Sequence, residues 1–262
     1  MEFLVVGAAA LLVSGLTLYS GFGLGTLLMP VFALFFPVEM AVAATAVVHG
    51  ANSAFKAVAV GKGADRSLVL GFGVPAVLAA LVGAACLTYV SGLGAIATYT
   101  VGARTAEITP IKLLVAALML AFAALELSPR LRGVEIGRRH LTLGGCLSGF
   151  FGGLSGHQGA LRSAFLARTC ESPRAFVGTN AVIGLMVDLA RTSGYVAMFA
   201  VGGQAGRLAP GQWWLILTGT LAAFAGVMLA KRFLHSVTMR SVQTLTARML
   251  VVFALALAAG LI

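Results

Sequence analysis

The polar residues best suited to bind an anion lie in a glycine-rich stretch that is otherwise apolar enough to enter a lipid bilayer. Residues 149–162 read GFFGGLSGHQGALR, with five glycines, and they include His157, Gln158 and Arg162. Backbone N–H and C=O groups without helical partners are tolerated at membrane depth only where protein or a water-filled cavity covers them. An arginine at that depth is by default a sign of a functional site. We therefore expect this break to form part of a binding site.

A weaker copy of the same stretch lies near the N-terminus. A shift of 134 residues places Ser14 on Ser148, Gly15 on Gly149, Gly25 on Gly159 and Thr45 on Thr179. Broken apolar segments at corresponding positions of two halves are the best sequence indication of a transporter binding site. We predict two homologous transmembrane repeats, residues 1–134 and residues 135–262.

Two of the expected helices each carry a polar face. In helix 40–60 the spacing i, i+4, i+7, i+11 places Thr45, His49, Asn52 and Lys56 on one side. In helix 174–199 the same reasoning groups Asn180, Gly184, Asp188 and Arg191, with Thr179 next to them. Because these helices correspond in the two halves, we expect the faces to line one shared cavity.

Cations predominate among these groups, which favours an anionic ligand. Arginine binds carboxylate, sulfonate or phosphate oxygens with two parallel hydrogen bonds, and helix N-termini at the breaks would add free N–H donors. Histidines that titrate near neutral pH are suited to proton coupling. The predicted substrate site consists of Gly25, Thr45, His49, Asn52, Gly156, His157, Gln158, Gly159, Arg162, Thr179 and Asn180, and the proton-coupling candidates are His49, His157 and Asp188.

Each of these groups also has a purely structural interpretation. Lys56 can extend to the aqueous surface, Asp188 and Arg191 can form an ion pair, and His49 can bond a neighbouring helix. The glycines of the break can serve close helix packing. His157 is the hardest to explain in this way, because it lies inside the glycine break.

Composition places the chain among polytopic membrane proteins. Hydrophobic residues make up 60% and charged residues 10%, against roughly 25% charged in a soluble domain. The net charge of +10 fits cytoplasmic loops rich in Lys and Arg better than nucleic-acid binding. The three cysteines lack metal-site spacing, so we expect neither a metal site nor a cofactor.

The positions of the loop cations favour re-entrant breaks. If each broken segment enters and leaves on one face, the loop arginines and lysines gather on one side, except Arg104 and Arg207, as the positive-inside rule requires. We therefore predict an all-α protein in which each half has a glycine-broken hairpin and three transmembrane helices, with the halves inverted and both termini outside. The expected apolar segments are 3–20, 24–36, 40–60, 67–90, 108–127, 141–153, 157–168, 174–199, 211–230 and 243–262, with a Gly-rich loop at 91–107.

With these motifs in place, the chain resembles the TauE/SafE family of sulfite-exporter-like permeases over its whole length. The resemblance rests on Ser14–Gly15 with the Gly21–Pro30 run, and on residues 148–159, SGFFGGLSGHQG. The first copy has Gly-Leu-Gly where the family usually has a glycine triplet, and the second lacks the proline that follows. The resemblance implies an anion permease of the bacterial or archaeal cytoplasmic membrane, for sulfite, sulfoacetate or other sulfonates.

The function expected from these observations is secondary transport of a small sulfur-containing anion, coupled to protons by alternating access. A passive anion channel on the same fold is the first alternative. An intramembrane serine protease is the second, because Gly153–Gly156 reads GLSG, the short rhomboid signature. That motif lacks a histidine on a later transmembrane helix to act as its base. The expected partners are the anion, protons and lipid, and a homo-oligomer is left open.

Overall fold

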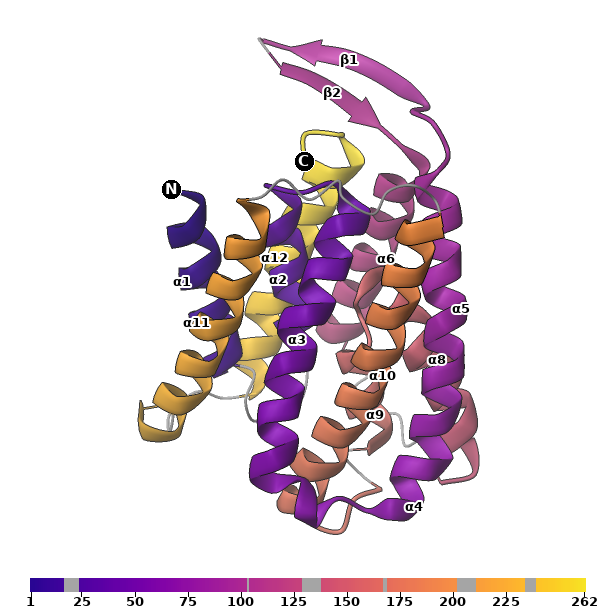
Figure 1. Cartoon of the computed structure of the whole chain (residues 1–262), viewed down its shortest axis with the longest axis vertical. Coiled ribbons are helices and arrows are strands. Elements are labelled where there is room, and N and C mark those ends of the chain that lie inside the picture. The colour runs from indigo at the N-terminus through magenta and orange to yellow at the C-terminus, as the bar shows by residue number, and fades with distance from the viewer. Residues whose placement is uncertain (17–23, 103, 129–137, 167–168, 202–210, 234–238) are drawn as a thin grey trace.

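The structure is a computed structural model that describes residues 1–16, 24–102, 104–128, 138–166, 169–201, 211–233 and 239–262. Three parts of the sequence prediction lie outside the described residues: positions 20–23 of the predicted break Ser20–Gly25, most of the basic loop 130–140, and Arg207. The described chain is mostly helical, as predicted (Figure 1).

Helices follow one another in the order that the apolar segments predict. The first half contains α1 (Glu2–Leu16), α2 (Leu24–Ala33), α3 (Val38–Val60), the 3₁₀ turn η1 (Gly61–Gly63), α4 (Arg66–Leu68), the π-helical turn η2 (Val69–Gly73), α5 (Val74–Ser91) and α6 (Pro110–Leu127). The second half contains η3 (Arg138–His140), α8 (Leu141–Ser155), α9 (Gly159–Leu166), α10 (Pro173–Val201), α11 (Gln212–Phe233) and α12 (Met239–Ala258).

The predicted Gly-rich loop 91–107 is instead largely a β-hairpin. Strands β1 (Ala97–Val101) and β2 (Arg104–Ile108) pair antiparallel, with Ala97 opposite Ile108. Threonine, tyrosine and valine in β1 favour a strand, and Gly102 has the positive φ of 61° that the turn requires. The Tyr99 hydroxyl donates a hydrogen bond to the Ala259 carbonyl, which ties the hairpin to the end of α12.

Among the described residues, four helical segments are long and apolar enough to cross a membrane: Arg66–Ser91, Pro110–Leu127, Pro173–Ala200 and Gln212–Ala230. Of the six spans expected, α3 and α12 do not meet this criterion. Helix α3 has 23 residues, which is about 34 Å at 1.5 Å per residue and enough for a bilayer. Its polar face, with His49, Asn52, Ser53 and Lys56, lowers its hydropathy.

The second broken segment folds back on itself. The Ser148 hydroxyl of α8 donates to the Gln158 carbonyl at 2.9 Å, and a methyl group on Gly144 would meet the ring of Phe165 at the far end of α9. The two helices are therefore antiparallel. Both chain termini and the β-hairpin lie at one end of the bundle, and α4 lies at the opposite end (Figure 1).

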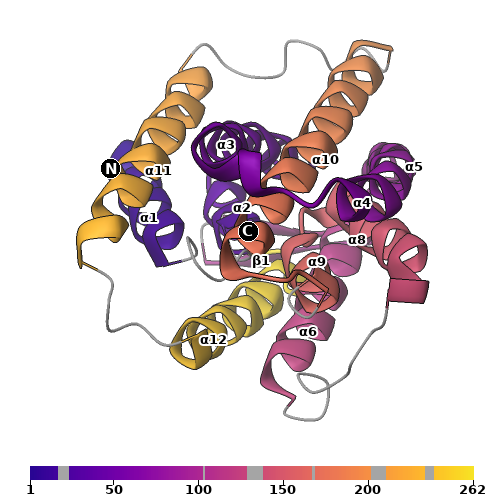
Figure 2. The ribbon, with the colours of Figure 1, turned by 90° about the horizontal axis from the view of Figure 1, so that it is seen from below.

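Helix pairs that are far apart in sequence hold the bundle together. Helix α1 packs on α11, α8 on α5, α6 on α12 and α3 on α10. Seen from below, α3 and α10 lie between the α1–α11 pair and the α5–α8 pair (Figure 2). On α8, Gly145, Gly149 and Gly153 are so close to the α5 segment that an added methyl group would overlap its backbone carbonyls.

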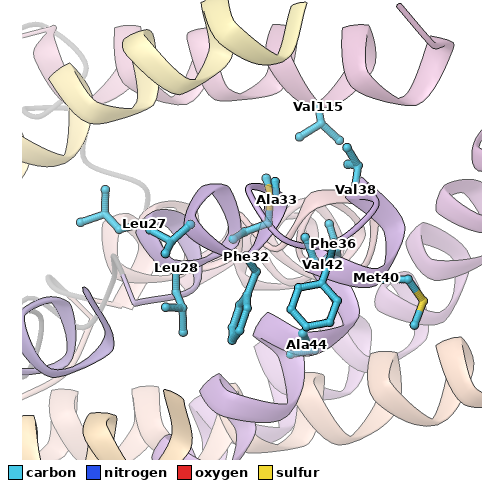
Figure 3. Packing of buried hydrophobic residues seen from close by; sticks show 14 of the residues in the cluster. Leu27, Leu28, Phe32, Ala33, Phe36, Val38, Met40, Val42, Ala44 and Val115 are labelled. Atoms are coloured by element: carbon cyan, nitrogen blue, oxygen red, sulfur yellow. The ribbon is translucent and has the colours of Figure 1, made fainter. Parts of the chain in front are cut away.

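An apolar core fixes α2 against the first turns of α3. Leu27, Leu28 and Phe32 of α2 belong to the same buried cluster as Val42 of α3, and Phe36 in the connection packs edge-on against Phe32 with ring centroids 5.6 Å apart (Figure 3). Burial of such side chains contributes roughly 1.5–3 kcal/mol each in water-soluble cores. In a membrane, close packing supplies the attraction between helices instead. The core therefore sets the position of α3 and of its polar face.

Candidate anion-binding site between α3 and α10

Glycines allow α3 and α10 to cross closely at the centre of the bundle. A methyl group on Gly50 would lie 3.1 Å from the Asp188 Cβ, and one on Gly184 would lie 3.1 Å from the Ser53 Oγ. Contacts this tight are uncommon, so an alanine at either position would require the facing side chain or helix to shift. The crossing brings the polar faces of the two helices together, as the sequence predicts.

Asp188 of α10 is the centre of a buried hydrogen-bond network. His49 Nδ1 lies 2.5 Å from its Oδ2, and the Ser53 hydroxyl donates to the same oxygen at 3.4 Å. Gln158 Nε2 donates to Oδ1 at 2.8 Å, and Arg191 pairs with Oδ1 through Nε at 2.9 Å and Nη2 at 2.8 Å. The Asp188–Arg191 ion pair and the His49 bond to a neighbouring helix, both foreseen as structural alternatives, are therefore present.

The same network pairs backbone groups of the glycine break. Arg191 Nη1 donates to the Gly152 carbonyl at 2.9 Å, and the Tyr195 hydroxyl donates to the Gly153 carbonyl. Helix α8 ends at Ser155 and is capped by Gly156, whose φ of 82° lies in the left-handed region that favours glycine. Side chains of α10 thus bond carbonyls near the end of α8, which would be costly to leave unpaired in lipid.

Arg162 of α9 is held by neutral amides. Its Nε donates to Asn180 Oδ1, and its Nη1 donates to Gln158 Oε1 at 3.1 Å. In the described part of the chain Arg162 makes no ion pair. The residue is only 2% exposed, so its charge is buried without a described carboxylate in ion-pair contact.

A small polar pocket opens beside Arg162, with room for about two water molecules. Its cations are Lys56 and Arg162, and its neutral donors and acceptors are two amides, one hydroxyl and one imidazole. The amide oxygen of Asn52 is buried and has no hydrogen-bond partner within the part of the chain that the structure describes. The residues that line the pocket are His49, Asn52, Ser53, Lys56, Arg162, Val177, Asn180 and Ala181.

Four of the eleven predicted site residues, His49, Asn52, Arg162 and Asn180, line this pocket. Gln158 lies behind Arg162, and both ends of its amide are bonded within the protein. Whether any of these residues binds substrate stays a prediction.

The predicted glycines mark where the two breaks meet. A methyl group on Gly25 of α2 would lie 3.1 Å from the Gly156 carbonyl oxygen and 3.5 Å from the His49 ring. Gly159 is buried and begins α9. The structure therefore brings the glycine breaks of both halves together next to His49, although none of these glycines lines the pocket.

The two corresponding threonines do not line the pocket. The Thr45 hydroxyl donates to the Ala41 carbonyl of its own helix at 2.7 Å. The Thr179 hydroxyl accepts the backbone N–H of Asp65 at 2.8 Å, from the turn between η1 and α4. Both side chains are fully buried, so their bonds are structural.

His157 also lies outside the pocket lining. Its ring stacks on Phe122 of α6, with centroids 5.3 Å apart and planes 9° from parallel. Nδ1 is 2.9 Å from the Ser155 carbonyl and 3.0 Å from the Ser155 hydroxyl, and Nε2 is buried with no hydrogen-bond partner among the described residues. The structure thus separates His157 from Arg162, which the sequence places close together.

The Ser155–His157 contact does not resemble an activated nucleophile. The Ser155 hydroxyl donates to the Phe151 carbonyl at 3.0 Å, and His157 Nδ1 faces a carbonyl oxygen that can only accept. A general base must instead accept the proton of the serine hydroxyl. The serine protease alternative therefore gains no support from this geometry.

Ser53 and Lys56 are pocket residues that the predicted site omits. Both lie on the polar face of α3, and the helical spacing that selects His49 and Asn52 also selects Lys56. The sequence is equally compatible with the other interpretation of Lys56, as a side chain that reaches the aqueous surface of the membrane. Val177 and Ala181 are apolar and gave no signal. In the described part of the chain no cluster of His, Cys, Asp and Glu could hold a metal ion.

Comparison with protein-family models matches residues 3–257 of the 262-residue chain to the family described as sulfite exporter TauE/SafE. The chain belongs to the TauE/SafE family. The match covers nearly the whole chain and confirms the resemblance, so this TauE/SafE member is a multi-pass membrane transporter of the sulfite-exporter type. No curated protein and no solved structure matches the chain.

Proposed function

We propose that this TauE/SafE protein is a secondary transporter for a small sulfur-containing anion such as sulfite, sulfoacetate or another organosulfonate. The anion would bind in the pocket between α3 and α10. The observation that carries the proposal is the buried Arg162 guanidinium, which neutral amides position and no described carboxylate pairs. A buried charge without a counter-ion is unfavourable, and a bound anion would remove that penalty.

Lys56 adds a second positive charge to the same pocket. Two cations with amide and hydroxyl donors match the oxygens of a sulfonate or sulfite group, which accept hydrogen bonds only. The pocket is small, which suits a compact oxyanion head. Gly25 and Gly159 are not among the residues that line the pocket, so the prediction that their backbone N–H groups bind the anion gains no support.

We assign proton coupling to the His49–Asp188 pair. The pair joins α3 to α10, and therefore one half of the chain to the other. A protonated His49 attracts Asp188, whereas a neutral His49 loses that attraction, so the proton can bias how tightly the helices associate. His157, the third candidate, stacks on Phe122 away from the pocket lining.

Alternating access between two inverted repeats, residues 1–134 and residues 135–262, is the proposed mechanism. Three contacts support it. Helix α1 packs on α11 while its counterpart α8 packs on α5, the counterpart of α11, and α3 packs on its own counterpart α10. Such exchanged pairing is what a two-fold relation between the halves produces. The basic loops would face the cytoplasm of a bacterial or archaeal cell.

The proposal is tested with purified protein and a thermal-shift screen of sulfite, sulfoacetate, methanesulfonate, sulfate and acetate. A ligand at about a hundred times its dissociation constant adds roughly 2.7 kcal/mol to stability. We expect a sulfur oxyanion to stabilise the wild type, and Arg162→Gln to abolish that shift. Lys62→Gln, which removes an exposed cation, is the matched control and should leave it intact. The proposal would be overturned if none of the anions raised the thermal stability of well-folded wild-type protein.

Uptake into liposomes distinguishes the coupled transporter from a passive channel on the same fold. A coupled transporter gives saturable uptake that depends on a pH gradient, and His49→Gln should remove that dependence. Wild-type uptake that does not depend on the pH gradient would favour the channel.

A further inference from the structure

We infer that Gln158 is a positioning residue that keeps the Arg162 guanidinium apart from Asp188, so that the charge of Arg162 stays available to an anion. The inference rests on the proposed anion-binding function. It concerns a residue that the sequence places in direct contact with substrate and that the structure places between two charged side chains instead.

Gln158 bridges the two charges with opposite ends of one amide. Its Oε1 accepts from Arg162 Nη1 at 3.1 Å, and its Nε2 donates to Asp188 Oδ1 at 2.8 Å. The Ser148 hydroxyl donates to its backbone carbonyl at 2.9 Å, and its side chain is 1% exposed. The residue is therefore fixed at both its backbone and its side chain.

The chemistry of the neighbours determines the orientation of this amide. A guanidinium can only donate and an ionised carboxylate can only accept, so the oxygen must face Arg162 and the nitrogen must face Asp188. A glutamate in this place would repel Asp188, and an apolar side chain would satisfy neither charge. An amide is the neutral group that satisfies both without transferring charge.

Without this spacer the nearest partner for Arg162 would be Asp188. Arg191 already pairs with Asp188 through Nε and Nη2, and a carboxylate can accept from more than one donor. Loss of the bridge would let the Arg162 guanidinium turn to the carboxylate, because opposite charges attract strongly in a buried site. The pocket would then lose one of its two cations.

Three variants test this positioning role. Gln158→Glu places a carboxylate next to Arg162, and Asn180→Asp does the same from the other side of the guanidinium. We expect each to weaken binding of divalent sulfite at pH 8 by about tenfold or more, and monovalent methanesulfonate by clearly less, because the pocket loses positive charge. Gln158→Met adds no charge, but it should also weaken sulfite binding, because Arg162 is then free to pair with Asp188.

The measurement is isothermal titration of both anions against purified, monodisperse wild type and variants. Equal losses for sulfite and methanesulfonate in Gln158→Glu, or wild-type affinity in Gln158→Met, would overturn the inference and leave the proposed function standing. If Gln158→Glu fails to fold, Asn180→Asp and Gln158→Met decide the question alone. Binding of neither anion by folded wild type would instead remove the proposed function, and the inference with it.

Discussion

The two proposed repeats follow the same order of helices but carry different polar side chains. Under the shift of 134 residues, Arg162 of the second break corresponds to Leu28 of the first, and Asp188 of α10 corresponds to Ala54 of α3. Leu28 lies in the apolar core, whereas Arg162 faces the pocket. The second half thus carries the charged break.

The first half supplies its polar groups from the long helix α3. His49, Asn52 and Lys56 of α3 line the pocket, whereas the corresponding positions of α10 are the apolar Ile183, Met186 and Ala190. Neither half holds a complete set of groups. Under the proposed repeat, each half supplies different side chains to one pocket at the crossing of α3 and α10.

The largest effect that tests this comparison concerns packing. Gly149 of α8 leaves room for the Ala76 carbonyl of α5, which an added methyl group would overlap. Gly149→Ala should lower the free energy of unfolding by about 2 kcal/mol or more, because backbone cannot move aside as a side chain can. Thermal or denaturant unfolding of the purified protein measures this loss.

The matched control lies on α1, the counterpart of α8. A methyl group on Gly7 would meet only Thr218 at 3.5 Å, an ordinary contact. Gly7→Ala should be neutral or slightly stabilising, since alanine is the better helix former by roughly 1 kcal/mol. Equal destabilisation by both substitutions would show that α1–α11 and α5–α8 pack alike, and would remove this part of the comparison.

The helices and their polar faces can be predicted from the sequence, because the length of an apolar segment and the helical spacing of its polar residues are local properties. The faces containing His49 and Asn180 meet as expected, and the glycine breaks lie near them. The partners of a polar group depend on tertiary contacts instead. Gln158 and His157 are neighbours in sequence, yet one joins the Asp188 network and the other stacks on Phe122.

The β-hairpin shows the same limit for loops. Residues 97–108 are rich in threonine and other strand formers, but Gly92, Gly94 and Gly102 made the segment look like an irregular loop. Its strands pair with each other, and Tyr99 fixes them to the end of α12. Contacts between the halves at this end cannot be inferred from local pattern.

An intermediate effect is expected at the helix crossing, where corresponding glycines have different neighbours. A methyl group on Gly184 would lie 3.3 Å from both terminal nitrogens of Arg162, and one on Gly50 would lie 3.1 Å from the Asp188 Cβ. Gly184→Ala should reduce anion uptake several-fold with little change in stability, because a long side chain can shift. Gly50→Ala should lower the unfolding free energy by about 1 kcal/mol or more.

Uptake assays and unfolding curves on both glycine variants separate these two outcomes. A loss of stability in Gly184→Ala as large as in Gly50→Ala would indicate that the two sides of the crossing are equivalent. That result would contradict the asymmetry of the site.

The smallest effect distinguishes the corresponding threonines. Thr179→Val removes the acceptor for the Asp65 N–H, which ties the η1–α4 turn to α10, and should lower the unfolding free energy by about 1 kcal/mol. Thr45→Val removes only a bond to the Ala41 carbonyl of the same helix, whose backbone bond remains, and should change stability by less than about 0.5 kcal/mol. Unfolding curves in parallel measure both. If Thr45→Val costs as much as Thr179→Val, the first threonine has a role beyond its own helix, and the two halves are more alike than their hydrogen bonds indicate.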